Sequence, residues 1–243
     1  MVHILAFGVH PDDVELGCSG TLAAAVAEGK KVVVVDLTAG ELGTRGTPTT
    51  RKAEAAEAAE ILGLHARENL GMADGFFENN EGNKRLVITA IRKYQPEIVL
   101  CNAVEDRHPD HGRSAQLVSD ACFLSGLRKI QTHDEQGEPQ QAWRPTYVFH
   151  YIQDRFLKPD FVVDISAHIE TKMQSVLAYS TQFNAKENDG EPTTYISTPE
   201  FFESVRARAL MLGKRIGVAY AEGFISPKTL GFSSFDSLIK NVT

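Results

Sequence analysis

The sequence is poor in cysteine and has no long apolar run. Its 243 residues include only three cysteines, Cys18, Cys101 and Cys122, and no CxxC motif. An odd number of widely spaced cysteines argues against a disulfide framework and favours a reducing compartment. Cys101 lies in a strand-like run and Cys122 in a helix-like one, so we expect both to be buried thiols. No apolar stretch approaches the roughly 18 residues of a membrane span, and no basic leader precedes the first apolar run. We therefore expect a cytoplasmic protein that does not enter a membrane.

An excess of positive charge is also absent. The chain has 25 basic and 32 acidic residues, which gives a formal net charge of −7. Nucleic acids and anionic membrane surfaces are bound by basic patches, so we expect neither as a partner. With 42% apolar residues, the chain can bury an ordinary globular core. A small-molecule partner stays open, including an anionic one held by a local arginine.

Apolar runs alternate with amphipathic stretches along the chain. The predicted strands are residues 2–9, 31–37, 97–100, 146–151 and 161–165, and the predicted helices are residues 17–28, 50–62, 85–94, 112–125, 167–180 and 199–217. This alternation is typical of a Rossmann-like α/β fold, in which helices cover both faces of a doubly wound, mostly parallel sheet. No internal repeat or linker divides the chain. We expect one domain spanning residues 1–243, with a polar insertion at 129–142.

The first predicted strand lacks the glycine-rich turn of a dinucleotide-binding domain. Residues 8–13 read GVHPDD and do not match G-x-G-x-x-G. A pyrophosphate needs close approach to backbone N–H groups, whereas two adjacent aspartates repel phosphate and attract a cation. The turn therefore favours metal binding over nucleotide binding.

Two histidine–aspartate clusters follow predicted strands. Residues 10–13 read HPDD, and residues 108–111 read HPDH. Ligands bind at the carboxyl ends of the strands in open α/β sheets, so we expect both clusters at one edge. A catalytic zinc uses histidine and carboxylate ligands and keeps one position open. His10, Asp13 and His111 can supply that set, since His10 and Asp13 are three residues apart in a turn.

The other residues of the two clusters suit acid and base roles. Asp12 would point away from the metal and take a proton from the attacking water. His108 would hydrogen-bond the substrate oxygen or protonate the leaving group, and Asp110 would orient His108 and favour its cationic form. A single His-Pro-Asp sequence is common in turns. The prediction of a metal site depends on two such clusters after two strands.

On these residues, the chain resembles the LmbE/PIG-L family of zinc-dependent amidohydrolases, which remove the N-acetyl group from N-acetylglucosamine units. The A-x-H-P-D-D signature occurs at 8–13 with glycine in place of alanine, and the second signature occurs at 107–111 as RHPDH. A Thr-x-Gly-Glu loop occurs at 38–41. Softer matches to the bacillithiol-pathway branch are GTRGT at 43–47, Arg51, RENL at 67–70, FLSGL at 123–127, WRP at 143–145, VDIS at 163–166 and STQF at 180–183.

The resemblance implies hydrolysis of the acetamide of N-acetyl-D-glucosaminyl L-malate in bacillithiol biosynthesis, with a small glycoside as substrate. It implies one Zn²⁺ per chain on the three ligands named above, which also accept other divalent metals such as Fe²⁺. Asp12 matches the general base of the family. His108, supported by Asp110, matches the residue that stabilises the oxyanion.

The resemblance also assigns residues to substrate binding. Arg51 and Arg107 match arginines at the substrate edge, and the planar fork of Arg51 suits the carboxylates of malate. Glu41 is expected to hydrogen-bond sugar hydroxyls. Tyr195 is our candidate for a tyrosine that a late loop places over the metal. Family members are often homo-oligomers, including hexamers, so we expect self-association.

Two other functions stay open. A broader N-acetylglucosamine or chitooligosaccharide deacetylase would need a longer cleft lined by aromatic residues. The single tryptophan and the arginines of the expected substrate loop weigh against it. A non-catalytic metal- or sugar-binding module would have no use for Asp12 and His108, whose presence favours an enzyme.

Overall fold

The computed structural model describes residues 1–183 and 190–238. Its strands form one sheet in the order β3-β2-β1-β4-β5-β7-β6. The strands are β1 Ile4–Gly8, β2 Val32–Thr38, β3 Ala66–Met72, β4 Ile98–Cys101, β5 Tyr147–Tyr151, β6 Phe161–Asp164 and β7 Ala221–Ile225. Strand β7 is antiparallel to both β5 and β6, and the other neighbouring strands are parallel. The expected mostly parallel sheet is confirmed.

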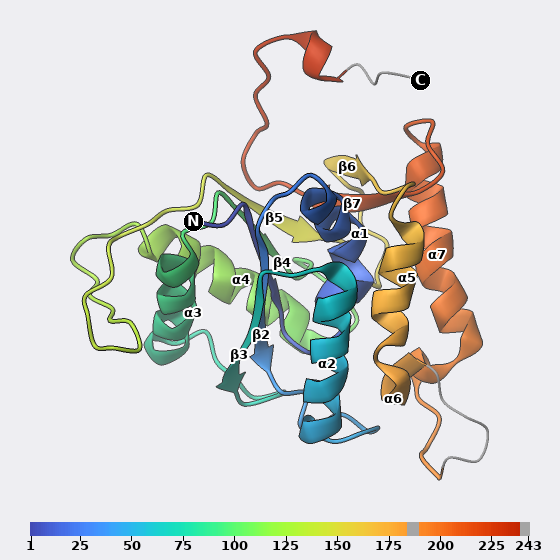
Figure 1. Ribbon diagram of the computed structural model, residues 1–243, viewed down its shortest axis with the longest axis horizontal. Helices are drawn as coiled ribbons and strands as arrows, with labels where there is room; N and C mark the ends of the chain where they lie inside the picture. Colours follow the sequence, from blue (N-terminus) through green and yellow to red (C-terminus); the bar gives the residue numbers. More distant parts are fainter. Residues whose placement is uncertain (184–189, 239–243) are drawn as a thin grey trace.

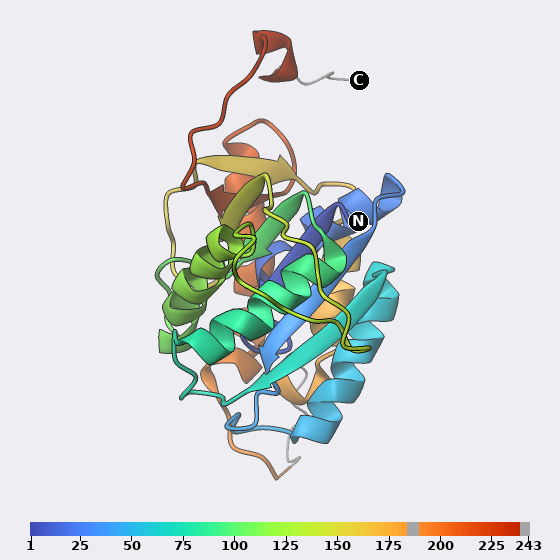
Figure 2. The ribbon, with the colours of Figure 1, turned by 90° about the vertical axis from the view of Figure 1, so that its left-hand side faces the viewer.

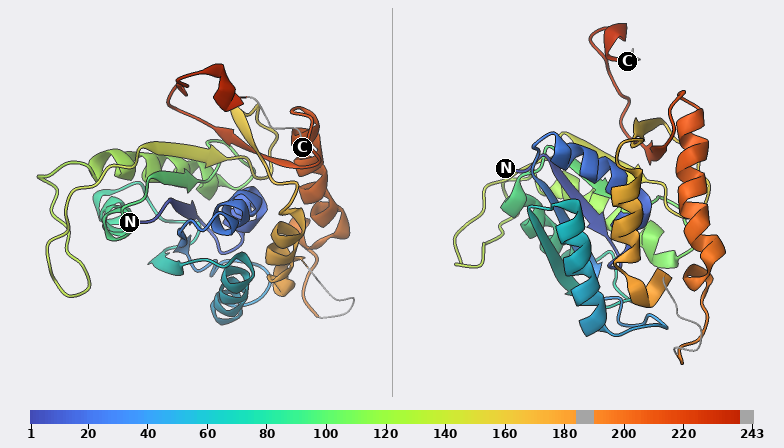
Figure 3. Two further views of the ribbon diagram at one scale, coloured as in Figure 1. Left: turned by 45° about the horizontal axis from the view of Figure 1, so that its top comes forward. Right: turned by 45° about the vertical axis from the view of Figure 1, so that its right-hand side comes forward.

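Helices cover both faces of this sheet (Figure 1). Helices α3 and α4 lie on one face, and α1, α2 and α5 lie on the other, where α7 runs beside α5 (Figure 3). The helices are α1 Asp13–Ala27, α2 Pro48–Leu62, α3 Glu81–Tyr94, α4 Pro109–Leu124, α5 Ile169–Leu177, α6 Ser180–Phe183 and α7 Pro199–Lys214. The short 3₁₀ helices are η1 Tyr195–Ser197 and η2 Phe235–Leu238. The expected doubly wound arrangement is confirmed.

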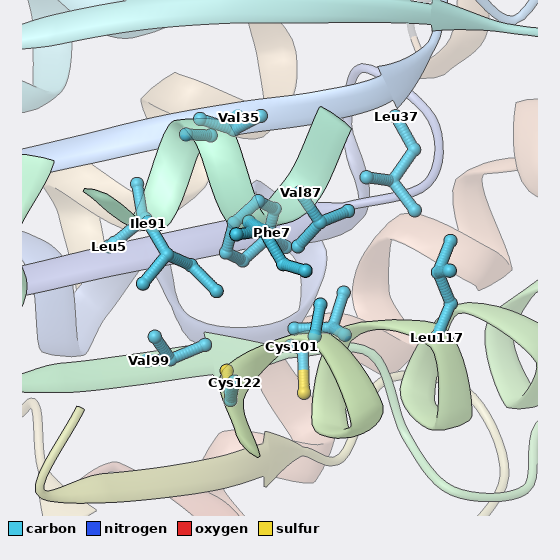
Figure 4. Packing of buried hydrophobic residues seen from close by; sticks show 14 of the residues in the cluster. Leu5, Phe7, Val35, Leu37, Val87, Ile91, Val99, Cys101, Leu117 and Cys122 are labelled. Carbon is cyan, nitrogen blue, oxygen red and sulfur yellow. The ribbon is translucent and has the colours of Figure 1, made fainter. Parts of the chain in front are cut away.

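Strand β1 supplies both faces of the core. Leu5 and Phe7 pack with the apolar residues of α3 and α4, as Figure 4 shows. Ile4 and Ala6 point to the opposite face and pack against α1. Successive strand residues alternate between faces, so a strand buried on both sides must be apolar throughout. This is why the first predicted strand was readable as one continuous apolar run.

The sequence analysis missed two strands, β3 and β7. Strand β3 lies at an edge of the sheet and carries Arg67, Glu68 and Asn69, which hide any apolar pattern. Strand β7 contains Glu222, which is buried and paired with Lys172 at 2.7 Å. Both strands contain charged residues whose partners lie far away in the sequence. No local pattern could therefore identify them.

The polar insertion at 129–142 runs along α3 (Figure 2). Arg92 of α3 is buried and donates to the carbonyl of Ile130 and the hydroxyl of Thr132 within this segment. It also donates to the carbonyls of Ser125 and Leu127 just before the segment. A single guanidinium with five donors can hold several turns of irregular chain at once. This segment is therefore fastened to the domain.

The remaining expectations about the body of the chain concern thiols and membranes. Cys18, Cys101 and Cys122 are buried free thiols, and the expected burial of Cys101 and Cys122 is confirmed. Burial raises the pKa of the Cys101 thiol well above its ordinary value. In the described ranges, no helix has the length and apolar character needed to cross a membrane.

Candidate active site

The two histidine clusters flank a topological switch point of the sheet. From β1 the chain continues outward to β2 and β3, and it then returns to β4 on the other side of β1. Loops that leave two adjacent strands in opposite directions open a crevice between them. Residues 9–12 follow β1, and residues 102–108 follow β4, so both clusters border this crevice. Their sequence-predicted placement at one edge is confirmed.

Asp13 lies between His10 and His111. Its Oδ2 atom is 3.5 Å from Nδ1 of His10, and its Oδ1 atom is 3.2 Å from Nε2 of His111. In a tetrahedral site with zinc–ligand distances of roughly 2.0–2.1 Å, neighbouring donor atoms are roughly 3.3 Å apart. The donor types therefore fit zinc, and each histidine lies near this spacing from one of the two Asp13 oxygens.

Each of these two histidines is held from behind by a buried carboxylate. Nε2 of His10 lies 3.0 Å from Oδ1 of Asp74, and Nδ1 of His111 lies 2.7 Å from Oδ2 of Asp106. A carboxylate on the far ring nitrogen fixes the orientation of a metal-ligating histidine. The sequence analysis missed both aspartates. Asp74 follows the end of β3, so recognition of this strand in the sequence would have pointed to it.

The charges around the two histidines favour a cation. Although burial lowers the pKa of His10, its contacts with Asp13 and Asp74 raise that pKa to about 10. Burial also lowers the pKa of His111, but Asp13 and Asp106 raise it to about 9. The carboxylates outweigh desolvation at both rings. The electrostatics thus agree with the donor set.

Asp13 is fixed by hydrogen bonds from several loops. The backbone N–H groups of Val9 and His10 donate to its Oδ2 atom, as does Nδ2 of Asn102. Nε2 of Gln153 donates to Oδ1 at 2.7 Å. Burial raises the pKa of Asp13, but His111 and His10 hold it well below its ordinary value. Asn102 and Gln153, which follow β4 and β5, are further residues that the sequence analysis missed.

Asp12 sits in a strained backbone conformation beside this group. Its φ angle is 133°, which is in the region that favours glycine, and it makes no side-chain cap bond to α1. Oδ2 of Asp12 instead accepts a hydrogen bond of 3.0 Å from Nη2 of Arg51. Burial outweighs this pairing and raises the pKa of Asp12 to about 7. This backbone conformation costs of order 1–3 kcal/mol. It places the Asp12 carboxylate at the pocket, where it does not cap the helix.

His108 is oriented by a backbone group. The N–H of Asp110 donates to Nδ1 of His108 at 3.3 Å, which caps α4 and leaves Nε2 as the N–H donor of the neutral ring. The Asp110 carboxylate instead accepts from the backbone N–H of Gly75 and from Arg113. Asp110 therefore contacts His108 through its backbone N–H, while its carboxylate contacts other groups. Burial and the nearby charges of His10 and His111 also lower the pKa of His108, contrary to the expected cationic form.

His108 also lies close to the two histidines of the candidate metal site. Ring nitrogens of His10, His108 and His111 lie within 4.8 Å of one another. A third imidazole near the same position is compatible with zinc, which binds three histidines in some catalytic sites. The geometry thus allows either His108, which meets this spacing, or Asp13, which contacts both His10 and His111, as the third donor.

Arg51 lines the pocket and pairs there with Asp12. It is 4% exposed, and its Nη2 atom donates to the carbonyl of Pro11 at 2.6 Å and to Asp12 at 3.0 Å. The side chain that caps α2 is Thr47, whose hydroxyl accepts from the backbone N–H of Thr50. Asp12 is an anion that accounts for a cation at this helix start. Nε of Arg51 has no hydrogen-bond partner among the described residues, and the contact of Arg51 with malate stays a prediction.

The other predicted substrate residues lie in different surroundings. Tyr195 is 57% exposed and donates to Oδ1 of Asp154 at 3.2 Å, and the guanidinium of Arg107 stands 4.7 Å over its ring. Both residues line the same pocket as His10. Glu41 does not line it, because its carboxylate accepts the backbone N–H of Asp74 at 2.8 Å.

These side chains enclose one pocket with a volume of about 300 Å³. Small-molecule sites have volumes of roughly 300–1,000 Å³ and hold a few convergent polar groups. The lining includes His10, Asp12, Asp13, His108 and His111, together with arginines from several segments. The arrangement can hold a divalent cation beside a carboxylate base and an N–H donor, which are the groups required for hydrolysis of an amide.

Comparison with known proteins agrees with this chemistry. A family model described as "PIG-L: GlcNAc-PI de-N-acetylase" matches residues 5–122, which contain both histidine clusters. The chain is 29% identical over 230 residues to the diacetylchitobiose deacetylase of Thermococcus kodakarensis, with 90% of this chain and 81% of that protein covered. It is 44% identical over 125 residues to the uncharacterized deacetylase YaiS of Escherichia coli, with 49% and 67% covered.

A solved structure extends the likeness to the whole domain. The conserved protein TT1542 of Thermus thermophilus superimposes with a TM-score of 0.85 at 37% identity, and 97% of this chain and 99% of that chain are covered. The similarity in sequence, the shared fold and the two clusters at the switch point lead to one conclusion. This chain belongs to the PIG-L family of de-N-acetylases.

Proposed function

We propose that the protein is a metal-dependent deacetylase that hydrolyses the acetamide of an N-acetylglucosaminyl glycoside. The observation that carries the proposal is the convergence of His10, Asp13 and His111 in one pocket with Asp12 and His108. The names of its relatives, which include a diacetylchitobiose deacetylase, support the same chemistry. The reaction adds water across the amide C–N bond and releases acetate and a free amine.

His10, Asp13 and His111 would hold the metal, for which zinc is our first proposal and Fe²⁺ an alternative. When bound, the metal supplies a Lewis acid that lowers the pKa of water and polarises the amide carbonyl. The protein contributes rigid positioning: Asp74 and Asp106 hold the two rings in the required orientation.

Asp12 is placed to move the proton. Arg51 holds its carboxylate at the pocket, where it can take a proton from the attacking water and return it to the leaving amine. His108 presents Nε2–H, because its Nδ1 accepts the backbone N–H of Asp110. That donor can stabilise the oxygen on which negative charge develops as the carbonyl is attacked. We therefore assign His108 to the oxyanion as a neutral donor.

For the substrate, our finer proposal is N-acetyl-D-glucosaminyl L-malate. The pocket lining supports an acidic glycoside, since it contains Arg107 and Arg208 in addition to the internally paired Arg51. The alternative is a neutral N-acetylglucosamine or chitooligosaccharide substrate, which the similarity to diacetylchitobiose deacetylase supports equally. A homo-oligomeric state remains a prediction that sedimentation can test.

An acetate-release assay tests the proposed function. Purified protein is incubated with N-acetylglucosaminyl malate, diacetylchitobiose or free N-acetylglucosamine, each before and after treatment with a chelator and after restoring zinc. We expect release that the chelator abolishes and zinc restores, with the malate glycoside hydrolysed fastest. Faster hydrolysis of diacetylchitobiose would select the alternative. If all three substrates stayed intact with metal bound, the deacetylase assignment would be wrong.

A further inference from the structure

One wall of the pocket carries two guanidinium groups against a single carboxylate. Asp154, which follows β5, lies between Arg107 and Arg208 of α7. Its Oδ2 atom is 3.4 Å from Nε of Arg107, and its Oδ1 atom is 3.8 Å from Nη2 of Arg208. All three side chains line the pocket. Asp154 is thus shared between two guanidinium groups, and the charge of Asp106 also acts on Arg208.

Arg208 is weakly paired within its own chain. Only 15% of its side chain is exposed, and its ion pair with Asp154 is long at 3.8 Å. A guanidinium carries five donors, yet none of those of Arg208 makes a hydrogen bond to another residue in the part of the chain that the structure describes. Burial lowers its pKa although Asp154 and Asp106 act in the opposite direction. The desolvation of Arg208 is therefore not offset by the surrounding protein.

The Asp154 carboxylate also accepts a hydrogen bond from a third residue of the pocket. Its Oδ1 atom, the one nearer Arg208, accepts the hydroxyl of Tyr195 at 3.2 Å. The other carboxylates of the pocket are engaged elsewhere: Asp12 pairs with Arg51, and Asp74 pairs with His10. Neither of these carboxylates accepts a hydrogen bond from the Arg208 guanidinium. A ligand with several anionic oxygens could accept these hydrogen bonds if it entered the pocket.

We propose that Arg208, together with Arg107, forms a subsite for an anionic group on the aglycone of the substrate. The planar forks of two arginines suit the oxygens of a carboxylate or of a phosphate, and both share this chemistry. Arg208 then sets the preference for anionic over neutral glycosides, and Asp154 competes with the ligand for the two guanidiniums. The sugar part of the ligand rests on the proposed function, whereas anion binding does not.

Direct binding tests the subsite without turnover. Calorimetry on the metal-loaded protein measures the Kd of L-malate and of inorganic phosphate for wild type, Arg208→Gln, Asp154→Asn and the control Arg215→Gln. Arg215 lies just after α7, and its guanidinium stacks on Phe156, outside the pocket lining. Since hydrogen bonds to charged groups are strong, we expect Arg208→Gln to weaken binding about tenfold or more. Asp154→Asn should tighten it, and Arg215→Gln should match wild type.

Arg208→Gln and Asp154→Asn are expected to change the affinity in opposite directions. If Arg208→Gln fails to fold, the tighter binding expected of Asp154→Asn still supports the subsite. Unchanged affinity in both variants would overturn it, as would equal weakening in Arg208→Gln and Arg215→Gln. The larger loss, on malate or on phosphate, identifies the anion for which the subsite is built.

Turnover then separates this inference from the proposed function. The ratio of kcat/KM for the malate glycoside, or for N-acetylglucosamine 1-phosphate, to that for the neutral methyl glycoside is compared among the same variants. We expect this ratio to fall about tenfold or more in Arg208→Gln and to stay constant in Arg215→Gln. Deacetylation with an unchanged ratio would refute the subsite alone. Anion binding that depends on Arg208, without any deacetylation, would refute the proposed function alone.

Discussion

Asp106 contacts His111 at 2.7 Å, on the ring nitrogen opposite the one that faces Asp13. The residue that orients a candidate ligand is thus five positions away in the sequence, outside the two conspicuous clusters. The same relationship recurs between Asp74 and His10, across 64 positions. In each ring, one nitrogen therefore faces Asp13 and the other contacts a second carboxylate, and this arrangement has measurable consequences.

The first prediction concerns Asp106→Asn. The amide cannot hold the His111 ring as the carboxylate does, so we expect metal affinity to fall about 10–100-fold. Competition with a fluorescent chelator measures the affinity. Glu105→Gln is the matched control, because Glu105 is exposed and pairs with Arg155. Equal affinity in the Asp106 variant and the control would show that the carboxylate has no role in metal binding.

The second prediction concerns Asp12→Asn. The variant keeps His10, Asp13 and His111, so metal content from elemental analysis should match wild type. Its amide cannot accept a proton, and removal of a general base costs about 10²–10⁴ in rate. A steady-state assay should show this loss in kcat. Near-normal kcat would move the base role to another residue.

The third prediction concerns Arg51→Ala, whose effect should not depend on substrate. Because Arg51 contacts Asp12 and the carbonyl of Pro11, its loss disturbs the proposed base directly. We expect kcat/KM to fall at least about tenfold for acidic and neutral glycosides alike, since a charge-assisted contact is lost. A loss confined to the malate glycoside would instead restore Arg51 as the residue that binds the anion.

The fourth prediction concerns the buried pair of Lys172 and Glu222. Nζ of Lys172 also donates to the carbonyls of Glu15 and Leu16, and both members of the pair are nearly inaccessible. Lys172→Met leaves the Glu222 charge buried without its cation, which costs about 3–5 kcal/mol of unfolding free energy.

Urea denaturation measures that cost against an exposed ion pair. Arg206→Gln removes the contact with Glu170, an exposed carboxylate, and should cost at most about 1 kcal/mol. Similar losses in the two variants would contradict the role assigned to burial at Lys172.

The sequence by itself determined the fold class and the centre of the site. Strands buried on both faces must be apolar throughout, so β1 and β4 were visible as apolar runs, and one histidine cluster follows each of them. His10 and Asp13 needed only a three-residue spacing in a turn to converge. Each of these features depends on neighbouring residues along the chain, and for this reason a single sequence contained them.

Only the tertiary structure decided which groups face one another across the crevice. Arg51 pairs with Asp12, which lies 39 positions earlier and could not be recognised as its partner from the sequence. The contact of Arg208 with Asp154 and the carboxylate behind His10 join segments that the fold brings together. Burial then sets the strength of these pairs, because desolvation depends on everything packed around a charge. The sequence therefore indicated which segments carry the functional residues, and the tertiary packing determines which charged groups pair with one another.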